Sequence, residues 1–181
     1  DTVTTDQFAE ALAELKAKDM KALIIDLRNN LGGNFNSAVD IARQLLPAGM
    51  IVYTEDKDGK RVEYTCDGEH ELDMPMAVLV NGYTASAAEI LSGAIKDHNK
   101  GTLVGSQTYG KGIVQRIIAL EDGSAVKVTI NAYFTPSGVN IQGTGITPDI
   151  EVPFDRDAYK SDQKDNQLDK AIEILKGKLG G

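Results

Sequence analysis

Residues 75–91 read Pro-Met-Ala-Val-Leu-Val-Asn-Gly-Tyr-Thr-Ala-Ser-Ala-Ala-Glu-Ile-Leu, and this stretch decides the fold class. Met76 to Val80 is a short, unbroken apolar run of the kind that forms a strand buried on both faces. A turn follows at Asn81, and residues 85–96 have the apolar spacing of a helix that leaves the end of the strand. Strands that pass through tight turns into helices are typical of α/β folds, which bind ligands at such turns.

Further helices and strands extend outward from this unit in both directions. The spacing predicts helices at 4–18, between the turn at 29–34 and Pro47, and at 165–177, with a capping box at Thr4-Thr5-Asp6-Gln7 and Gly177 as the final stop. Strands are predicted at 21–28, 103–104, 113–120 and 125–132, and a hairpin joins 50–54 to 61–65 across Asp58-Gly59. Residues 135–149 are predicted to form an ordered loop. We therefore expect an α/β fold, one domain over residues 1–181, with one central mixed sheet flanked by helices.

The composition limits the classes of function. The 181 residues are 41% apolar and 25% charged, which is enough for one hydrophobic core. Nineteen basic residues against 27 acidic ones give a net charge of −8 and a pI near 4.8, which argues against a nucleic-acid partner and an anionic membrane surface. The longest apolar runs are far below the ~20 residues of a membrane span. Cys66 is the only cysteine, and His70 and His98 lie outside any metal-binding spacing, so we expect no disulfide framework and no metal site.

Ser86 is the first candidate for chemistry because it opens the predicted helix at the end of the buried strand. That place leaves its hydroxyl unshielded and puts the Ala87 N–H near the positive end of the helix, where it can stabilise an oxyanion. Serine is also a preferred helix cap. Position alone therefore leaves a nucleophile and an ordinary cap as open alternatives.

A serine nucleophile needs a base, and Lys111 is the candidate. His70 and His98 both lie in polar, turn-like segments, which indicates solvated side chains. Lys111 instead lies between two glycines and precedes an apolar strand, an unusual setting for a lysine. Burial there would favour the neutral amine that a base requires. Gln115, four residues on, has the parity to face the same side of the strand.

Residues 105–111 also fit the GxxxxGK pattern of a phosphate-binding loop. That motif continues with serine or threonine and a helix, whereas Gly112 and a strand-like segment follow here. The sequence therefore does not favour nucleotide binding. Paired carboxylates such as Asp155 and Asp157 indicate a solvated surface.

Four stretches in this order resemble the carboxyl-terminal processing proteases, the tail-specific serine peptidases with a Ser/Lys dyad. They are Asp26-Leu-Arg-Asn-Asn-Leu-Gly-Gly33, Val80-Asn-Gly-Tyr-Thr-Ala-Ser-Ala-Ala-Glu-Ile90, residues 105–115 and residues 135–149. The resemblance covers about residues 5–153. It implies the ClpP/crotonase-like α/β core, in agreement with the fold expected from the pattern.

The resemblance also implies roles for individual residues. The family's nucleophile falls on Ser86, and its Gly-Lys-Gly-x-x-x-Gln element places the general base on Lys111 with Gln115 as the supporting glutamine. The remaining implied residues are Gly32, Gly33 and Ala87 as oxyanion donors, with Gly32 favoured over Gly33, and Asp97 in a supporting role. The departures from the family pattern are Leu31, Thr84, Ala88 and Val139, none of which is a proton-transfer group.

The implied activity is that of a serine endopeptidase without a cofactor. It would cleave protein or peptide substrates near an accessible C-terminus, through an acyl-enzyme on Ser86. By resemblance the parent protein is extracytoplasmic, in the periplasm, cell envelope or thylakoid lumen. Family members carry an N-terminal segment and a PDZ domain, so we expect this chain to be an excised core without either. The sequence leaves the oligomeric state open.

Two other interpretations stay open. The chain could be an inactive peptide-binding or scaffold fragment of the same fold, or a crotonase-type acyl-CoA enzyme, which does not need the Ser86/Lys111 pair. In an assembled dyad we expect Ser86 Oγ and Lys111 Nζ about 3 Å apart. Because glycines flank Lys111, we expect instead an open dyad with a displaced 105–112 loop.

Overall fold

The computed structural model of the chain describes residues 3–180. The helices are α1 (Thr4–Ala17), α2 (Phe35–Arg43), α3 (Ala87–Asp97), α4 (Arg156–Asp162) and α5 (Asn166–Leu179). The strands are β1 (Leu23–Asp26), β2 (Gly49–Asp56), β3 (Arg61–Cys66), β4 (Met76–Val80), β5 (Thr102–Gly105), β6 (Ile113–Ala119), β7 (Ala125–Phe134) and β8 (Ile150–Glu151). These strands form two sheets of four strands each.

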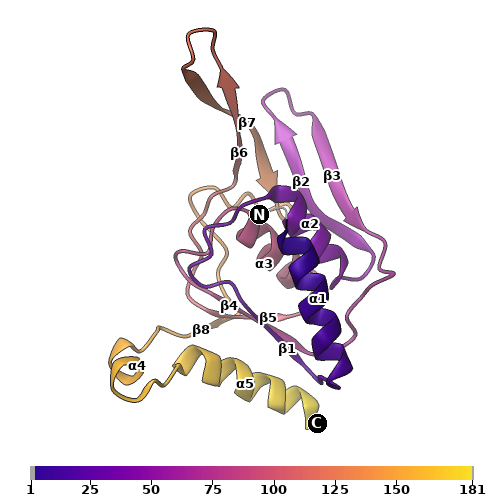
Figure 1. Ribbon diagram of the computed structural model, residues 1–181, viewed down its shortest axis with the longest axis vertical. Helices are drawn as coiled ribbons and strands as arrows, with labels where there is room; N and C mark the ends of the chain where they lie inside the picture. Colours follow the sequence, from indigo (N-terminus) through magenta and orange to yellow (C-terminus); the bar gives the residue numbers. More distant parts are fainter. Residues whose placement is uncertain (1–2, 181) are drawn as a thin grey trace.

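The first sheet is parallel and has β4 near its middle, in the order β1-β4-β5-β8. All five residues of β4 are buried, as their unbroken apolar run predicts. On one face Val78 and Val80 join the larger core with α1–α3 and β2, and on the other Ala77 and Leu79 pack against α5. Figure 1 shows α5 below this sheet and α1–α3 above it. The nucleophile candidate therefore follows the best-buried strand of the fold.

The second sheet is antiparallel, in the order β3-β2-β7-β6, with β6 at its edge. Its β6–β7 pair extends away from the body as a two-stranded ribbon (Figure 1). Several apolar side chains of this ribbon are exposed, namely Ile117, Ile118, Leu120, Val126 and Val128. The root of the ribbon pairs with β2, where Tyr53 is opposite Phe134 and their rings stack.

The expected α/β fold with sheets flanked by helices is confirmed. The parallel and antiparallel strands, however, form separate sheets and not one mixed sheet. Both edges of β4 are occupied by parallel partners, β1 and β5. The β2–β3 and β6–β7 hairpins pair with each other through β2 and β7 and so form a sheet of their own.

Three local predictions differ from the structure. Helix α1 begins at Thr4 with Val3 in the capping position and no side-chain cap, so the expected capping box is absent. Helix α5 continues through Gly177, which faces open space, to Leu179. Helix α4 and the two-residue β8 were not predicted at all. Asp155 begins α4 by accepting from the N–H groups of Asp157 and Ala158, so this carboxylate is a helix cap.

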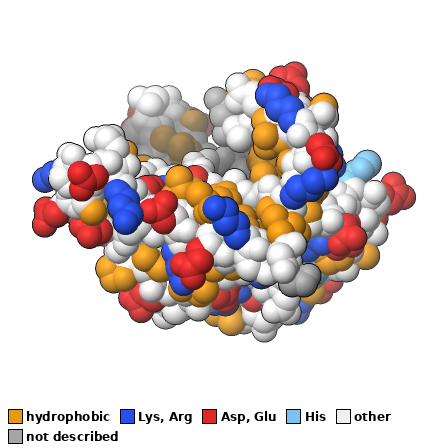
Figure 2. Space-filling model, turned by 90° about the horizontal axis from the view of Figure 1, so that it is seen from below, with side chains coloured by type: hydrophobic (Ala, Val, Ile, Leu, Met, Phe, Trp, Pro, Cys, Tyr) orange, Lys and Arg blue, Asp and Glu red, His pale blue; other side chains and the backbone are white. Residues whose placement is uncertain are grey.

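Within residues 3–180, the structure contains no helix with the length and apolar character needed to cross a membrane. Figure 2 views the molecule from below and shows acidic and basic side chains interspersed with apolar ones on this face.

Candidate active site

Ser86 lies at a sharp turn between β4 and α3, with a backbone conformation that L residues rarely adopt. Its φ is 56° and its ψ is −119°, a region that costs an ordinary residue about 1–3 kcal/mol. Hydrogen bonds from both sides hold the turn: the Ala85 N–H donates to Asn30 O, and the Ser86 N–H donates to Glu89 Oε2 at 2.9 Å. The side chain is half-buried. The turn thus presents the Ser86 hydroxyl at the carboxyl edge of the parallel sheet.

Glu89 is the central acceptor of the site, although its side chain is fully buried. Its Oε1 accepts from Thr108 Oγ1 at 2.6 Å and from the Gly110 N–H at 2.7 Å. Its Oε2 accepts from the Lys111 N–H at 2.8 Å as well as from the Ser86 N–H. The backbone nitrogens of Ser86 and Lys111 each lie within hydrogen-bond distance of the same oxygen atom, so they are close to each other.

The loop that carries Lys111 is packed closely on both sides, so the two glycines do not give its backbone the freedom that the sequence predicted. A Cβ on Gly110 would lie 2.8 Å from Gly145 N, and one on Gly112 would lie 2.6 Å from Gln142 N. The two glycines allow this close packing instead of providing freedom. The Gly112 N–H also donates to Gln142 Oε1, and the Gly112 carbonyl accepts from the Tyr133 N–H. The strand β6 that follows excludes the phosphate-loop interpretation of residues 105–111, which needs a helix there.

A cavity of about 290 Å³ brings most of the expected catalytic residues together. Its walls include Ser86, Ala87, Lys111, Gln115 and Gly33. Lys111 is half-buried and Gln115 is exposed. Among the described residues, no hydrogen bond joins Lys111 Nζ to Ser86 Oγ or to Gln115. The side chains of the two candidates are therefore not hydrogen-bonded to each other, although their backbone N–H groups share Glu89 Oε2 as acceptor.

The glycine turn that follows β1 lies directly against the Ser86 turn. A Cβ on Gly32, whose φ is 87°, would be 2.5 Å from Ala85 O and 2.8 Å from Ala87 N, so only glycine fits here. Within residues 3–180 the N–H groups of Ala87 and Gly33 donate to no protein acceptor. The Gly32 N–H donates to Asn30 Oδ1 at 2.9 Å. A role for Gly32 as an oxyanion donor thus requires the Asn30 side chain to release it.

The other titratable candidates lie elsewhere. Asp97, near the end of α3, accepts from the Ser137 N–H at 2.8 Å and holds the 135–149 loop. The His98 ring bonds to Met50 O, and His70 lines a different surface hollow. No group of three or more His, Cys, Asp or Glu side chains within residues 3–180 is placed to hold a metal ion.

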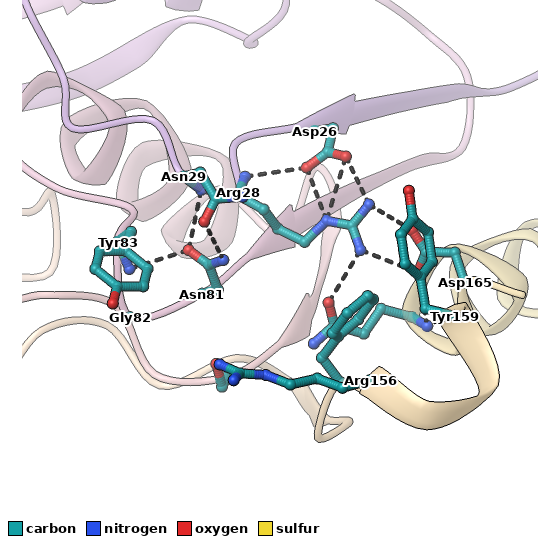
Figure 3. A pocket seen from close by; sticks show the side chains of 12 residues that line it. Asp26, Arg28, Asn29, Asn81, Gly82, Tyr83, Arg156, Tyr159 and Asp165 are labelled. Atoms are coloured by element: carbon teal, nitrogen blue, oxygen red, sulfur yellow. Dashed lines mark hydrogen bonds and ion pairs between the residues drawn. The ribbon is translucent and has the colours of Figure 1, made fainter. Parts of the chain in front are cut away.

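A second, larger cavity of about 530 Å³ lies between the parallel sheet and the α4–α5 segment (Figure 3). In it the Arg28 guanidinium lies between two carboxylates, Asp26 and Asp165, with an Nη2–O distance of 2.7 Å to each. Arg28 Nη1 also donates to Gln167 Oε1. Asn81 accepts from the Asn29 N–H and links the two turns. Arg28 therefore links the start of α5, at Asp165, to Asp26 at the end of β1.

Removing the charge of Asp165 tests how much the ion pair with Arg28 stabilises the fold. Arg28 donates hydrogen bonds to Asp165 and thereby lowers the pKa of its carboxyl group. A lowered pKa contributes stability at pH values above the unfolded pKa of about 3.9, and that contribution is lost as the pH falls through the folded value. We expect Asp165→Asn, which keeps the helix cap, to lower the free energy of unfolding by about 1 kcal/mol between pH 5 and 7.

Urea unfolding of wild type and Asp165→Asn at several pH values measures this difference, with exposed Asp73→Asn as the control. The difference should begin to shrink below about pH 4 and vanish once the pH is below the lowered pKa of Asp165. A difference that stays constant down to pH 2 would refute a charge-based contribution.

Sequence reasoning missed Glu89, Thr108 and Tyr133, all of which lie at the site. Glu89 occupies the third helical position after Ser86, where a glutamate commonly accepts from the backbone N–H of the capping residue. The spacing of three residues from Ser86 to Glu89 is therefore the pattern in the sequence that could have indicated the role of Glu89. Thr108 and Tyr133 have no such local pattern, since their contacts join distant parts of the chain.

Comparison with known proteins shows the family of this chain. The family model described as Peptidase family S41 matches residues 1–152. A carboxyl-terminal-processing protease of Synechocystis sp. is 42% identical over 173 residues, which is 94% of this chain and 40% of that protein. The chloroplastic C-terminal processing peptidase of Tetradesmus obliquus is 42% identical over 150 residues, covering 82% of this chain and 32% of the relative. The chain thus spans less than half the length of these relatives.

Solved structures show the same relationship. The photosystem II D1 C-terminal processing protease superposes with a TM-score of 0.80 and 41% identity, over 84% of this chain and 40% of that one. The tricorn protease, 23% identical, shares the fold with a TM-score of 0.62 over 89% of this chain and 15% of its own. The resemblance inferred from the four motifs is confirmed, and the chain belongs to peptidase family S41.

Proposed function

We propose that this chain is the catalytic core of a serine endopeptidase that cleaves protein substrates near their C-terminus. One observation carries the proposal: a single buried carboxylate oxygen, Glu89 Oε2, accepts from the backbone of both Ser86 and Lys111. Ser86 and Lys111 are 25 positions apart in the sequence, and both line one cavity. The hydrogen bonds to Glu89 hold their backbone nitrogens close together. The names of the relatives support the reaction class.

In the proposed mechanism Lys111 acts as the general base. Its side chain rotates toward Ser86, and the neutral Nζ takes the hydroxyl proton as Oγ bonds to the substrate carbonyl carbon. The resulting ammonium then returns that proton to the leaving amine, and water releases the acyl group. Gln115 lines the same cavity and would orient the ammonium by accepting from it. No cofactor takes part.

The oxyanion of the tetrahedral intermediate needs two or more donors. The Ala87 N–H is one, since it donates to no acceptor within residues 3–180 and lies at the first position of α3. The glycine turn supplies the second, from Gly32 after Asn30 has released it, or from Gly33. Each such donor contributes roughly 3 kcal/mol to comparable acyl transfers.

A second candidate function is a scaffold or peptide-binding module without activity. The open dyad favours it, because Lys111 Nζ and Ser86 Oγ form no hydrogen bond in the described part of the chain. Substrate binding, or segments present in the longer relatives such as a PDZ domain, would have to close the dyad. We further propose protein substrates with an accessible C-terminus and an extracytoplasmic or lumenal location, since three relatives are named as chloroplastic.

Labelling with a fluorophosphonate, which reacts with activated serines, tests the proposal. We expect wild type to be labelled at Ser86 and Lys111→Arg to react about 10²–10⁴-fold more slowly, because arginine keeps its charge and cannot accept the proton. Lys18→Arg, in an exposed ion pair with Glu14, is the matched control.

The outcomes separate the candidates. Equal labelling of wild type and Lys111→Arg would remove Lys111 from the mechanism. An unlabelled wild type with unchanged folding would favour the scaffold, and binding of acyl-CoA without labelling would favour the crotonase-type alternative.

A further inference from the structure

Tyr133 has an unexplained hydroxyl in the wall of the active-site cavity. The residue lies near the end of β7 and is 3% exposed. Its hydroxyl is the one buried side-chain oxygen or nitrogen within residues 3–180 that has no hydrogen-bond partner. Buried polar groups without partners are rare in native proteins and call for an explanation.

The fold gives no reason for this hydroxyl. The Tyr133 backbone N–H bonds to Gly112 O, and its ring contributes to the main core, so phenylalanine would serve both purposes. Burial of an unpaired hydroxyl lowers stability, and its removal is expected to be neutral or favourable. A group kept at a cost to stability beside reacting atoms suggests a role in function.

The surroundings make the phenol a donor. Burial raises its pKa, and the negative charge of Glu89 raises it further, so the hydroxyl keeps its proton at any working pH. Ser86 is the neighbouring polar side chain: its proximity acts to lower the pKa of Tyr133, yet no hydrogen bond joins the two in this open state. Lys111 lines the same cavity.

We propose that Tyr133 is a positioning residue whose hydroxyl donates to Ser86 Oγ when the dyad closes. A serine hydroxyl has one proton and two acceptor sites. When Tyr133 occupies one acceptor site, the serine proton is directed toward Lys111 Nζ and the second lone pair toward the substrate carbonyl. Tyr133 itself transfers no proton, because the Oγ proton passes to Lys111. This inference rests on the proposed function.

The test compares Tyr133→Phe with wild type in fluorophosphonate labelling and in thermal unfolding. We expect the labelling rate to fall 10-fold or more while the melting temperature stays the same or rises. With a peptide substrate the loss should appear in kcat and leave KM unchanged. The control is Tyr53→Phe, which alters a buried tyrosine that stacks on Phe134.

Each outcome decides the matter. Equal labelling of Tyr133→Phe and wild type overturns the inference and leaves the proposed function intact. Slower labelling with a lowered melting temperature overturns it too, because the hydroxyl would then be structural. An unlabelled wild type overturns the proposed function and this inference with it.

Discussion

Replacing Ser86 with glycine is expected to abolish peptide hydrolysis and at the same time to make the protein more stable. The hydroxyl is the proposed nucleophile, and loss of the equivalent group in serine proteases reduces turnover by at least roughly 10⁴-fold. The backbone at Ser86, with φ of 56° and ψ of −119°, is one that glycine adopts without strain. Relief of about 1–3 kcal/mol of strain, less about 0.5–1 kcal/mol for the greater freedom of unfolded glycine, leaves a gain of roughly 1 kcal/mol.

Ser86→Ala is the matched control, because alanine also lacks the hydroxyl but retains the strain. Both variants should be inactive on a fluorogenic peptide, and only glycine should shift the urea midpoint upward. A glycine variant no more stable than the alanine variant would show that the turn stores no strain. Turnover retained by either would remove Ser86 from the mechanism.

The second large effect is expected from Glu89→Gln, which should destabilise the fold and suppress labelling together. The carboxylate accepts two hydrogen bonds on each oxygen. In a glutamine the NH₂ replaces one of the two oxygens, and it then faces either the N–H groups of Ser86 and Lys111 or the Gly110 N–H and the Thr108 hydroxyl, which alone of these can accept from it. Either orientation leaves at least one buried backbone N–H unpaired, at a cost of roughly 1–3 kcal/mol for each.

Chemical unfolding and fluorophosphonate labelling of Glu89→Gln measure the two effects, with the exposed Glu10→Gln as the control. Glu89→Asp adds a graded test, because it keeps the charge but shortens the reach to Ser86 and Lys111. A stable Glu89→Gln protein with wild-type labelling would show that the four hydrogen bonds do not position the dyad.

The parts of the site that the sequence predicts are those encoded by contiguous residues. An apolar run followed by Ser86 at a helix start was enough to predict β4, the turn and α3, because burial and capping act over a few positions. The unusual setting of Lys111 between glycines identified it as a candidate, but those glycines serve close packing against residues 142–145. Their function depends on a partner that no local pattern reveals.

The features that escaped prediction depend on distant contacts or on weak patterns. Glu89 joins a helix to a loop some twenty residues away, and an isolated glutamate in a helix is ordinarily a surface residue. Helix α4 has no buried residue, so apolar spacing could not reveal it. The division of the strands into two sheets follows from the pairing of β2 with β7, whose partners, from Tyr53–Phe134 to Asp56–Asn131, are about 75–81 residues apart in the sequence. No local pattern reveals such a pairing.

The β6–β7 ribbon begins directly after the loop that carries Lys111, the proposed catalytic base. The outer half of the ribbon is exposed to solvent on both faces, and its opening would expose little further apolar surface. Such segments open with small free energies, so we expect the amide hydrogens near the tip at Asp122-Gly123 to exchange quickly. At the root, β7 pairs with β2 and the Lys111 loop is bonded to Glu89, where exchange requires far larger openings. We therefore expect the outer half of the ribbon to open more readily than its root, next to which the Lys111 loop lies.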